Sequence, residues 1–397
     1  MPGVVCLGEA MALLVPVLAD QAVDAASPSA ASGSTASNSA PPNDSALPRE
    51  PAHAAAIEAV CAVDVAEAVK AAEAVETAEA ASLSSPQPAG PVNTPYFATE
   101  VGGAEANTAC MLAALGVPAA WISRVGDDGL GRLILATLRA HGVDVSAVET
   151  DPDRPTGLYI KEITAAATRL RYYRTGSAAS AMGPALAQHP AIRGADLLHL
   201  SGITPALSGS CAALIDTLLG ESRPGRRISF DVNWRPTLWR GADPQRLLDS
   251  ARRADLVFVG ADEAEAAWGA DTPEQIRDLL REPELVVVKQ GAEGSTAFQG
   301  ESRVHVPALA LDVVEPTGAG DAFAAGFIAA GGSRFPDAPS LRSRLRLGTL
   351  AAGAVLRVRG DLATPPAARV IEAYLALDEA EWRRASTRPD QSVAGAA

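Results

Sequence analysis

The stretch that decides the fold reads Glu-Pro-Thr-Gly-Ala-Gly-Asp-Ala-Phe over residues 315–323. A strand-like run, Leu309–Val314, precedes it, and a periodic apolar pattern typical of a helix follows over 321–330. Gly318 and Gly320 permit a sharp turn whose backbone N–H groups can approach an anion closely. The start of the helix adds about half a positive charge and further unpaired donors. The stretch therefore predicts a cradle for a phosphoryl group.

Asp321 lies in the first turn of that predicted helix, and the motif alone leaves two interpretations open. A carboxylate at this position can simply stabilise the helix N-terminus. It can also act as the general base that a hydroxyl needs when it attacks a phosphoryl group. Other phosphate motifs fit less well, because no lysine is followed by Ser or Thr, as a Walker A loop requires, and the third glycine of the dinucleotide fingerprint is missing.

The chain around this motif alternates short apolar runs with helical patterns. Runs that are apolar on both faces and separated by helices indicate a parallel sheet covered on two sides. The predicted strands are Val4–Gly8, Ala120–Arg124, Leu197–Leu200, Ile228–Val232, Leu256–Val259 and Leu285–Lys289. The predicted helices are 105–115, 129–141, 209–220, 245–253, 262–268, 273–280, 321–330, 339–358 and 367–376.

Two stretches depart from this pattern. Thr156–Ile163 and Arg169–Arg174 alternate polar and apolar residues, and the small residues of 164–168 join them. They predict a hairpin with one exposed face. A hairpin that projects from an α/β body could act as a lid.

Charge and composition exclude several classes of function. The 397 residues carry 33 basic and 47 acidic side chains, a net charge of −14, which argues against nucleic acid as a partner. The four cysteines form no metal or disulfide pattern and indicate buried thiols of a reducing compartment. No apolar run is long enough to span a membrane, and the start lacks the basic region of a signal peptide, so we expect a cytoplasmic protein.

Residues 19–91 differ from the rest, because they are rich in Ala, Ser, Pro and Glu and poor in large apolar side chains. Ten acids and two bases give this segment −8 of the net charge. Such a composition cannot bury enough apolar surface to offset the entropy of ordering, so we predict a disordered insertion. The predicted organisation is then a first strand and the start of the lid in 1–18, the insertion, one α/β domain over 92–383 with lid strands at about 92–101 and 156–174, and a flexible tail over 384–397.

The motif over 316–323 resembles a signature of the ribokinase-like (PfkB) carbohydrate kinases. A second resemblance covers Val101-Gly102-Gly103-Ala104-Glu105-Ala106-Asn107, with Leu115-Gly116 and 124–131 after it. The resemblance implies an open, mainly parallel sheet with helices on both faces and a small β-sheet lid. It further implies that Asp321 deprotonates the acceptor hydroxyl. The amides of Gly318, Ala319 and Gly320 would form the anion hole, and ATP with Mg²⁺ would donate the γ-phosphoryl group.

The same resemblance implies nucleotide contacts in two further places. Residues 288–295 resemble the family's strand and turn beneath ATP, which assigns Lys289, Gly291 and Gly294 to the nucleotide; without the family, 288–295 is an ordinary turn between strands. Thr317, Gly318 and Gly320 of the phosphate motif are assigned to the nucleotide as well. Glu263 corresponds to a glutamate that organises magnesium through water. Two departures stand out, because Gly260 replaces the family's usual asparagine and Glu315 replaces its usual aspartate.

Cations and aromatic residues mark the other end of the predicted site. Strand alternation places Tyr172 and Arg174 on one face, with Tyr159 on the partner strand, while Arg235 follows a buried strand. Arginines are usually solvated surface residues. Two arginines that meet tyrosine hydroxyls in one crevice would suit a carboxylate ligand, because arginine binds a carboxylate with two parallel hydrogen bonds.

Within the family, these residues and 198–208 resemble the 2-keto-3-deoxygluconate kinases. That resemblance implies that Tyr159, Tyr172, Arg174 and Arg235 hold a sugar acid, whose 6-hydroxyl receives the phosphoryl group. By family resemblance Gly103 and Asn107 bind sugar hydroxyls, and Glu9 is an acid near the acceptor. Relatives often pair through their lids, so a homo-oligomer is a further expectation.

Three alternatives remain at the sequence level. A fructokinase or ribokinase acting on a neutral sugar is the nearest. A nucleoside kinase is disfavoured by the paired arginines, and a catalytically silent sugar-binding regulator is disfavoured by the intact Gly-Ala-Gly-Asp motif.

Overall fold

The computed structural model describes residues 3–16, 97–163, 168–221, 225–331 and 340–386. They belong to two compact units. The larger unit comprises Met1–Leu13, Glu100–Tyr159 and Tyr172–Ala397, and the smaller one comprises Leu14–Thr99 and Ile160–Arg171. The predicted insertion over 19–91 lies outside the described residues, as does most of the predicted tail.

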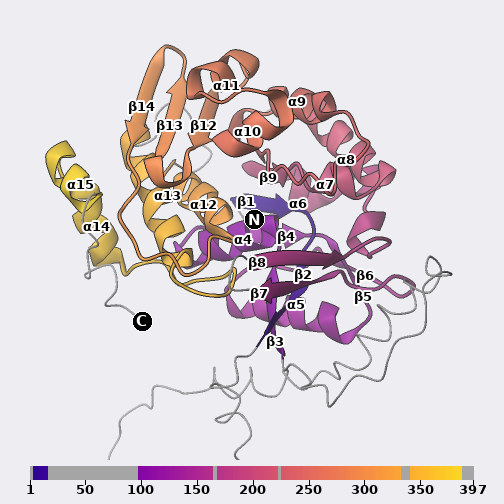
Figure 1. The fold of residues 1–397 in the computed structure, drawn as a ribbon. Coiled ribbons are helices and arrows are strands. Elements are labelled where there is room, and N and C mark those ends of the chain that lie inside the picture. Colours follow the sequence, from indigo (N-terminus) through magenta and orange to yellow (C-terminus); the bar gives the residue numbers. More distant parts are fainter. Residues whose placement is uncertain (1–2, 17–96, 164–167, 222–224, 332–339, 387–397) are drawn as a thin grey trace, which may run out of the picture. The chain divides into compact units, whose positions relative to one another are not determined.

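An eight-stranded sheet forms the centre of the larger unit, in the order β14-β13-β12-β11-β10-β9-β1-β4 (Figure 1). The strands from β4 to β12 pair in parallel, and β13 and β14 add an antiparallel edge. Their bounds are β1 Val4–Leu7, β4 Ala119–Ile122, β9 Leu197–Ser201, β10 Arg227–Asp231, β11 Leu256–Gly260, β12 Leu285–Lys289, β13 Ser295–Gln299 and β14 Ser302–Val306. The prediction of a mainly parallel sheet is confirmed, while the antiparallel edge was not predicted.

Alternate residues of the strands pack into two separate hydrophobic cores, one on each face of the sheet. On one face, Cys6 and Phe258 join a cluster with α4 (Ala104–Ala114), α5 (Gly129–Ala140), α12 (Ala319–Gly331) and α13 (Leu341–Val355). On the other face, Val5 and Val257 pack with α8 (Gly209–Gly220), α9 (Pro244–Arg252), α10 (Ala261–Trp268) and α11 (Pro273–Leu279). Strands buried on both faces are what a helix-covered parallel sheet requires.

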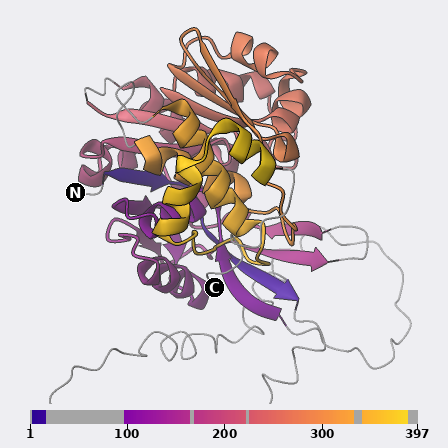
Figure 2. The ribbon, with the colours of Figure 1, turned by 90° about the vertical axis from the view of Figure 1, so that its left-hand side faces the viewer.

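The C-terminal helices extend the first of these layers. α14 (Ala368–Ala376) and α15 (Glu379–Ala385) follow α13 and lie beside it (Figure 2). Trp382 of α15 is buried, and its indole donates a hydrogen bond to the Pro307 carbonyl at 3.0 Å. Helix α15 was not predicted, and it extends to Ala385, beyond the predicted start of the tail at residue 384.

A second sheet, in the order β3-β2-β7-β8, has residues of each strand in both units. Its strands are β2 Met11–Pro16, β3 Phe97–Gly102, β7 Leu158–Ile163 and β8 Thr168–Tyr173. The neighbouring strands β7 and β8 correspond to the predicted hairpin, and β3 to the predicted lid strand near 92–101. A two-stranded sheet of β5 (Arg124–Gly126) and β6 (Glu149–Asp151) completes the strands of the described residues, which also include the short helices α6 (Pro190–Arg193) and α7 (Thr204–Leu207).

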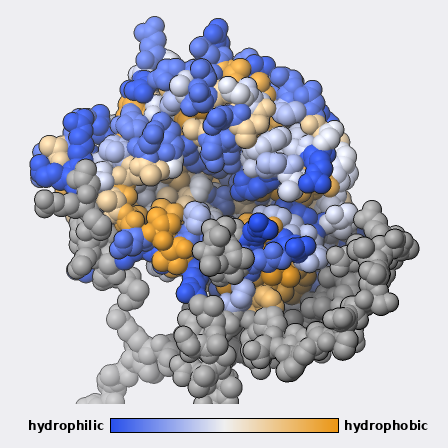
Figure 3. Space-filling view, viewed as in Figure 1, coloured by the Kyte–Doolittle hydropathy of each residue, from blue (hydrophilic) through white to orange (hydrophobic). Residues whose placement is uncertain are grey.

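The strand expected over Leu309–Val314 is wrong, because that segment is extended coil. The Val314 N–H donates a hydrogen bond at 2.7 Å to the Leu356 carbonyl, in the loop after α13 rather than on a sheet edge. Val313 and Val314 are the large apolar side chains that stand exposed among the described residues. The described surface in Figure 3 is otherwise mostly hydrophilic. None of the helices in the described ranges is long and apolar enough to cross a membrane.

Helices α12 and α13 cross at two glycines. A Cβ atom on Gly326 would lie 2.6 Å from the Leu347 carbonyl oxygen, and one on Gly348 would lie 2.9 Å from the Phe323 carbonyl oxygen. Both distances are shorter than van der Waals contact allows. The backbones therefore approach closely because neither residue has a side chain, and this fixes α12, which begins at the phosphate motif.

We expect Gly326→Ala to lower the free energy of unfolding by about 1–3 kcal/mol, because the added methyl forces the helices apart. Gly209→Ala is the matched control, since its Cβ would meet open space within helix α8. Alanine should there be neutral or stabilise by up to about 1 kcal/mol. Chemical denaturation of both variants measures this, and equal effects would contradict the close helix crossing.

Candidate active site

The glycine turn before α12 is held by its own residues. Gly318 has φ +84°, a left-handed backbone conformation that favours glycine, and a Cβ there would lie 2.9 Å from the Asp361 carbonyl oxygen. The Glu315 carboxylate accepts hydrogen bonds from the Thr317 N–H at 3.2 Å and from its hydroxyl at 2.8 Å. Glu315 thus fixes the turn, and the Ala319 N–H at the start of α12 donates back to the Pro316 carbonyl at 3.3 Å.

Asp321 is buried, and two asparagine amides hold its carboxylate. The Asn107 side chain, on α4, donates to Oδ2 at 2.9 Å, and the Asn233 side chain, after β10, donates to Oδ1 at 3.3 Å. The acceptor oxygens of both asparagines are buried and have no hydrogen-bond partner. Two unpaired acceptors beside a carboxylate are suited to receive hydroxyl groups of a ligand.

The surroundings raise the pKa of Asp321 to about 7, chiefly because burial disfavours the charged form. The hydrogen bond from Asn107 lowers the pKa, the negative charge of Asp231 raises it, and the positive charges of Lys289 and Arg235 lower it. A carboxylate with a pKa near the ambient pH can both accept and release a proton, as a general base must.

Asp231 and Lys289 form a buried ion pair across the carboxyl ends of β10 and β12. The Lys289 ammonium donates to both oxygens of Asp231, at 2.9 and 2.8 Å. Burial by itself lowers the pKa of Lys289, but Asp231 and Glu263 outweigh it and the pKa is raised. A Cβ on Gly320 would lie 3.2 Å from the Lys289 Nζ, so this charge lies beside the glycine turn.

Arg235 and Glu263 lie next to this pair. The Glu263 carboxylate accepts from the Gly260 N–H at 2.8 Å at the start of α10, and Arg235 Nη1 lies 3.4 Å from its Oε1. Burial is the main cause that raises the pKa of Glu263. The Arg235 side chain stays 42% exposed. It is near enough to Asp321 and Tyr172 for both to raise its pKa.

Two tyrosines and two charged residues form the other end of the site. The Tyr159 and Tyr172 rings stack with centroids 5.5 Å apart, and the Arg174 guanidinium lies 5.5 Å from the Tyr172 ring centroid. Arg174 forms an ion pair with Glu9. The Tyr159 hydroxyl donates to Asp361 at 2.6 Å, and a Cβ on Gly102 would clash with that hydroxyl.

The structure therefore brings most of the predicted residues together. Asn107, Asp321, Lys289, Arg235 and Glu263 share one polar cluster, and Glu9, Arg174, Tyr159 and Tyr172 share another. The backbone of Gly103 packs on the Glu9 carbonyl. Gly291 and Gly294 lie in the turn between β12 and β13, where both have positive φ and the Gly294 N–H donates to the Gly291 carbonyl at 3.2 Å. Their assignment to the nucleotide stays a prediction.

Sequence reasoning missed three side chains of the site: Asp231, Asn233 and Asp361. Asp231 and Asn233 directly follow the apolar run of β10, at the sheet edge where ligands bind in open α/β folds, and that position was a usable signal. Asn233 also carries a positive φ of 43°. Asp361 comes from a loop after α13 that no local pattern marks.

The side chains of this site limit how a magnesium ion could bind. Among the described residues, no group of three or more Asp, Glu, His or Cys side chains could hold a metal ion. Mg²⁺ usually keeps several waters and binds through one or two carboxylates and substrate phosphates. Glu263 and Asp231, whose negative charges both act on Lys289 beside Gly320, are the carboxylates that could take part in such binding.

We expect Asp321→Asn to stabilise the protein, and more so at pH 8 than at pH 5. The pKa of Asp321 is raised in the folded state, so its contribution to stability is fully present below the unfolded value near 4 and is lost as pH rises through about 7. Asparagine cannot ionise and escapes that loss. Thermal unfolding at both pH values measures this, with exposed Asp127→Asn as control; a gain that does not grow with pH would contradict the shift.

Comparison with known proteins identifies the family to which this chain belongs. The model of the pfkB family carbohydrate kinases matches residues 65–368. The 2-dehydro-3-deoxygluconokinase of Thermoproteus tenax is 37% identical over 294 residues, which cover 70% of this chain and 86% of that protein. The Bacillus subtilis (strain 168) enzyme of the same name is 35% identical over 287 residues, covering 70% and 87%.

Solved structures agree on the fold. The PfkB protein from Polaromonas sp. JS666 superimposes with a TM-score of 0.64 at 29% identity, covering 91% of this chain and 98% of that one. A putative ribokinase II from E. coli, solved in complex with ATP and Mg²⁺, gives a TM-score of 0.66 at 19% identity, covering 94% and 99%. The fold is thus ribokinase-like, as predicted, and the chain belongs to the pfkB family of carbohydrate kinases.

Proposed function

We propose that this protein transfers the γ-phosphoryl group of ATP to the 6-hydroxyl of 2-keto-3-deoxygluconate, giving 2-keto-3-deoxy-6-phosphogluconate. The observation that carries the chemistry is the buried Asp321 carboxylate at the first turn of α12, held by Asn107 and Asn233. The choice of sugar is supported by the relatives that are 37% and 35% identical and by the cations at the sugar end.

In the proposed reaction, Asp321 accepts the proton of the sugar hydroxyl as that oxygen attacks the γ-phosphorus of ATP. The bond from the γ-phosphorus to the bridging oxygen of ADP breaks, and the proton stays on Asp321 until it passes to solvent. The Gly318, Ala319 and Gly320 amides and the Lys289 ammonium would stabilise the negative charge that develops on the transferring group. Donors fixed in place before the reaction need no reorganisation during it.

Magnesium bound with ATP would neutralise phosphate charge and align the transferring group. Glu263, with Asp231 beside it, is the carboxylate that would hold this ion through water. Thr317, Gly291 and Gly294 complete the proposed nucleotide contacts.

The sugar acid would lie between the two polar clusters. The unpaired Asn107 and Asn233 oxygens would accept its hydroxyl protons. Its carboxylate would bind the guanidinium of Arg235, together with Arg174 and the hydroxyl of Tyr172. The Arg235 side chain is partly exposed, and its Nη1 donates to the Trp234 carbonyl at 2.9 Å and lies 3.4 Å from Glu263.

A kinase of a neutral sugar, such as a fructokinase, is the second candidate. Arg174 favours it to a degree, because the negative charge of Glu9 already neutralises this arginine. The two candidates differ in whether Arg235 recognises a carboxylate. Pairing through the lid remains a prediction under both.

We expect Arg235→Ala to lower kcat/KM for 2-keto-3-deoxygluconate about 10- to 100-fold, since the variant loses a charge-assisted hydrogen bond to the substrate. The loss with D-fructose should be several times smaller. Release of ADP by the purified full-length chain on both sugars measures this. Arg281→Ala is the matched control, because Arg281 is an exposed arginine paired with Asp278.

Equal losses on the two sugars would argue against carboxylate recognition by Arg235. A wild-type protein that phosphorylates fructose faster than the keto-deoxy acid would replace the proposed substrate by a neutral one.

A further inference from the structure

Glu9 and Arg174 form a buried ion pair at the sugar end of the site. Glu9 follows β1 and is 2% exposed, and Arg174 follows β8 and is 8% exposed. The Arg174 Nη2 pairs with Glu9 Oε2, and the Ser177 hydroxyl donates to Oε1 at 2.6 Å. Oε1 therefore has a hydrogen-bond donor, while Oε2 has the charge of Arg174 beside it but no hydrogen bond.

Two glycines fix the position of Glu9. A Cβ on Gly103 would lie 2.5 Å from the Glu9 carbonyl oxygen, so the backbone of Glu9 packs directly on the Gly102–Gly103 turn. A Cβ on Gly157 would lie 2.8 Å from Glu9 Oε1. The side chain therefore lies against a strand end that has no side chain of its own, with little freedom to turn elsewhere.

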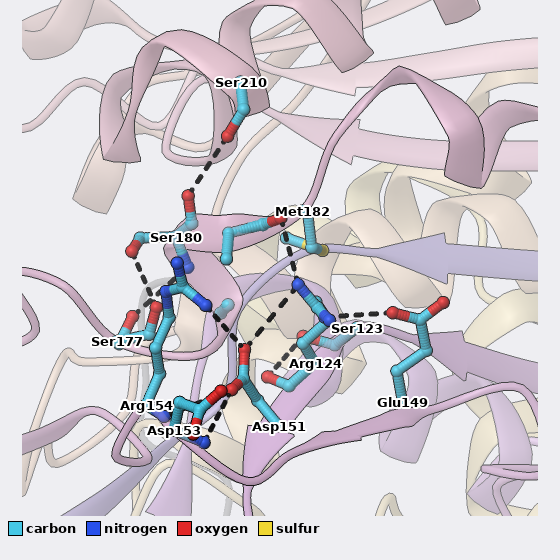
Figure 4. A network of polar contacts seen from close by, with 12 residues as sticks. Ser123, Arg124, Glu149, Asp151, Asp153, Arg154, Ser177, Ser180, Met182 and Ser210 are labelled. Atoms are coloured by element: carbon cyan, nitrogen blue, oxygen red, sulfur yellow. Dashed lines mark hydrogen bonds and ion pairs between the residues drawn. The ribbon is translucent and has the colours of Figure 1, made fainter.

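The turn that carries Ser177 is anchored from the other side. The Ser177 N–H donates to the Arg174 carbonyl at 3.1 Å, and the Ala178 N–H donates to the Pro155 carbonyl at 2.8 Å. Arg124 Nη1 donates to the Ala181 carbonyl at 3.3 Å and lies in ion pairs with Glu149 and Asp151 (Figure 4). Ser177, which donates to Glu9, thus lies in a turn that several polar contacts hold in place.

These contacts leave a buried donor of Arg174 without a partner. Its Nη2 is taken by Glu9, and its Cζ lies over the Tyr172 ring, but its Nε is buried and has no hydrogen-bond partner. A buried donor without a partner costs free energy until a ligand oxygen satisfies it. Nε and Nη2 lie on the same edge of a guanidinium group, so a substrate oxygen that approaches this edge beside Glu9 would find an unpaired donor.

We infer that Glu9 is not a sugar ligand but the positioning residue of Arg174, which it aligns, with Ser177, for an oxygen of the substrate. This revises the direct contact that the family resemblance implies for Glu9, and it rests on the proposed function for the identity of the sugar. Glu9 also cancels the charge of Arg174, so Arg174 contributes alignment, while Arg235, whose contact with Glu263 is 3.4 Å and whose side chain is 42% exposed, is the cation left to respond to the charge of an acid.

A double-mutant cycle on the purified full-length chain tests this, with Glu9→Gln, Arg174→Ala and the double variant. We expect Glu9→Gln to raise KM for the sugar acid about 10-fold, with kcat within about 2-fold and KM for ATP unchanged, because alignment of the sugar is lost and the phosphoryl end is not touched. The double variant should match Arg174→Ala alone. Glu274→Gln, which removes a carboxylate from a surface ion pair with Arg303, is the matched control and should change nothing.

Losses that multiply in the double variant would overturn the inference, because Glu9 would then act independently of Arg174. An unchanged KM in Glu9→Gln would overturn it as well. If the wild type phosphorylates fructose and not the sugar acid, the proposed function fails, and the same cycle run on fructose still decides the role of Glu9.

Ser177→Ala keeps the inference testable if Glu9→Gln melts at a markedly lower temperature. This variant keeps the ion pair and removes only the hydroxyl that holds Oε1. We expect a 2- to 5-fold rise in KM for the sugar, absent when Arg174 is already alanine. An unchanged KM, or an equal rise in the Arg174→Ala background, would contradict the positioning role.

Discussion

The Asp321 carboxylate is buried at the start of α12, and both of its oxygens accept hydrogen bonds from asparagine amides. Burial raises its pKa to about 7, and the fold keeps the group there although ionising it costs free energy. The close crossing of α12 and α13 at Gly326 and Gly348 secures the helix that carries it. The turn ahead of it is fixed by Glu315 and by the left-handed Gly318. Burying an ionisable carboxylate therefore lowers the free energy of unfolding, and it does so at the place where proton transfer would need a basic group.

Cations of the site each have an acidic partner within the protein. Lys289 pairs with Asp231, Arg235 with Glu263 and Arg174 with Glu9. A cation left alone in a buried site would be costly, and a cation fully paired from all sides could not bind a substrate. The three pairs differ in tightness. Arg235 keeps the longest contact and the most exposed side chain, so it is the cation best placed to respond to the charge of a ligand.

The sequence was sufficient for the parallel strands and for most of the site, because both depend on local patterns. Apolar runs predicted β1, β9, β10, β11 and β12, and the Gly-Ala-Gly-Asp motif predicted the turn and α12. The strands β13 and β14 were missed, since an antiparallel edge has no helix between its strands to mark them. The segment over 309–314 has strand composition but binds the loop after α13, a tertiary contact that composition does not encode.

The hydrogen-bond and ion-pair partners of the functional side chains were harder to predict than the side chains themselves. Nothing local shows that Lys289 reaches Asp231, which lies 58 residues earlier on a strand two positions away in the sheet. The pairing of Glu9 with Arg174 joins residues from distant parts of the chain, and Asp361 lies in a loop that contacts Tyr159 and Gly318. Residue type and position along a strand predicted where chemistry occurs, and the three-dimensional structure was needed to see what holds each group.

The most direct test of the account is the rate of phosphoryl transfer in Asp321→Asn, measured in a single turnover with ATP, magnesium and the sugar. Asparagine keeps the shape of the side chain and cannot accept the proton. The account predicts a fall of roughly 10²–10⁴-fold in the rate with ATP binding unchanged. A variant that transfers the phosphoryl group at nearly the wild-type rate would show that another group removes the proton, and would contradict the central role given to this carboxylate.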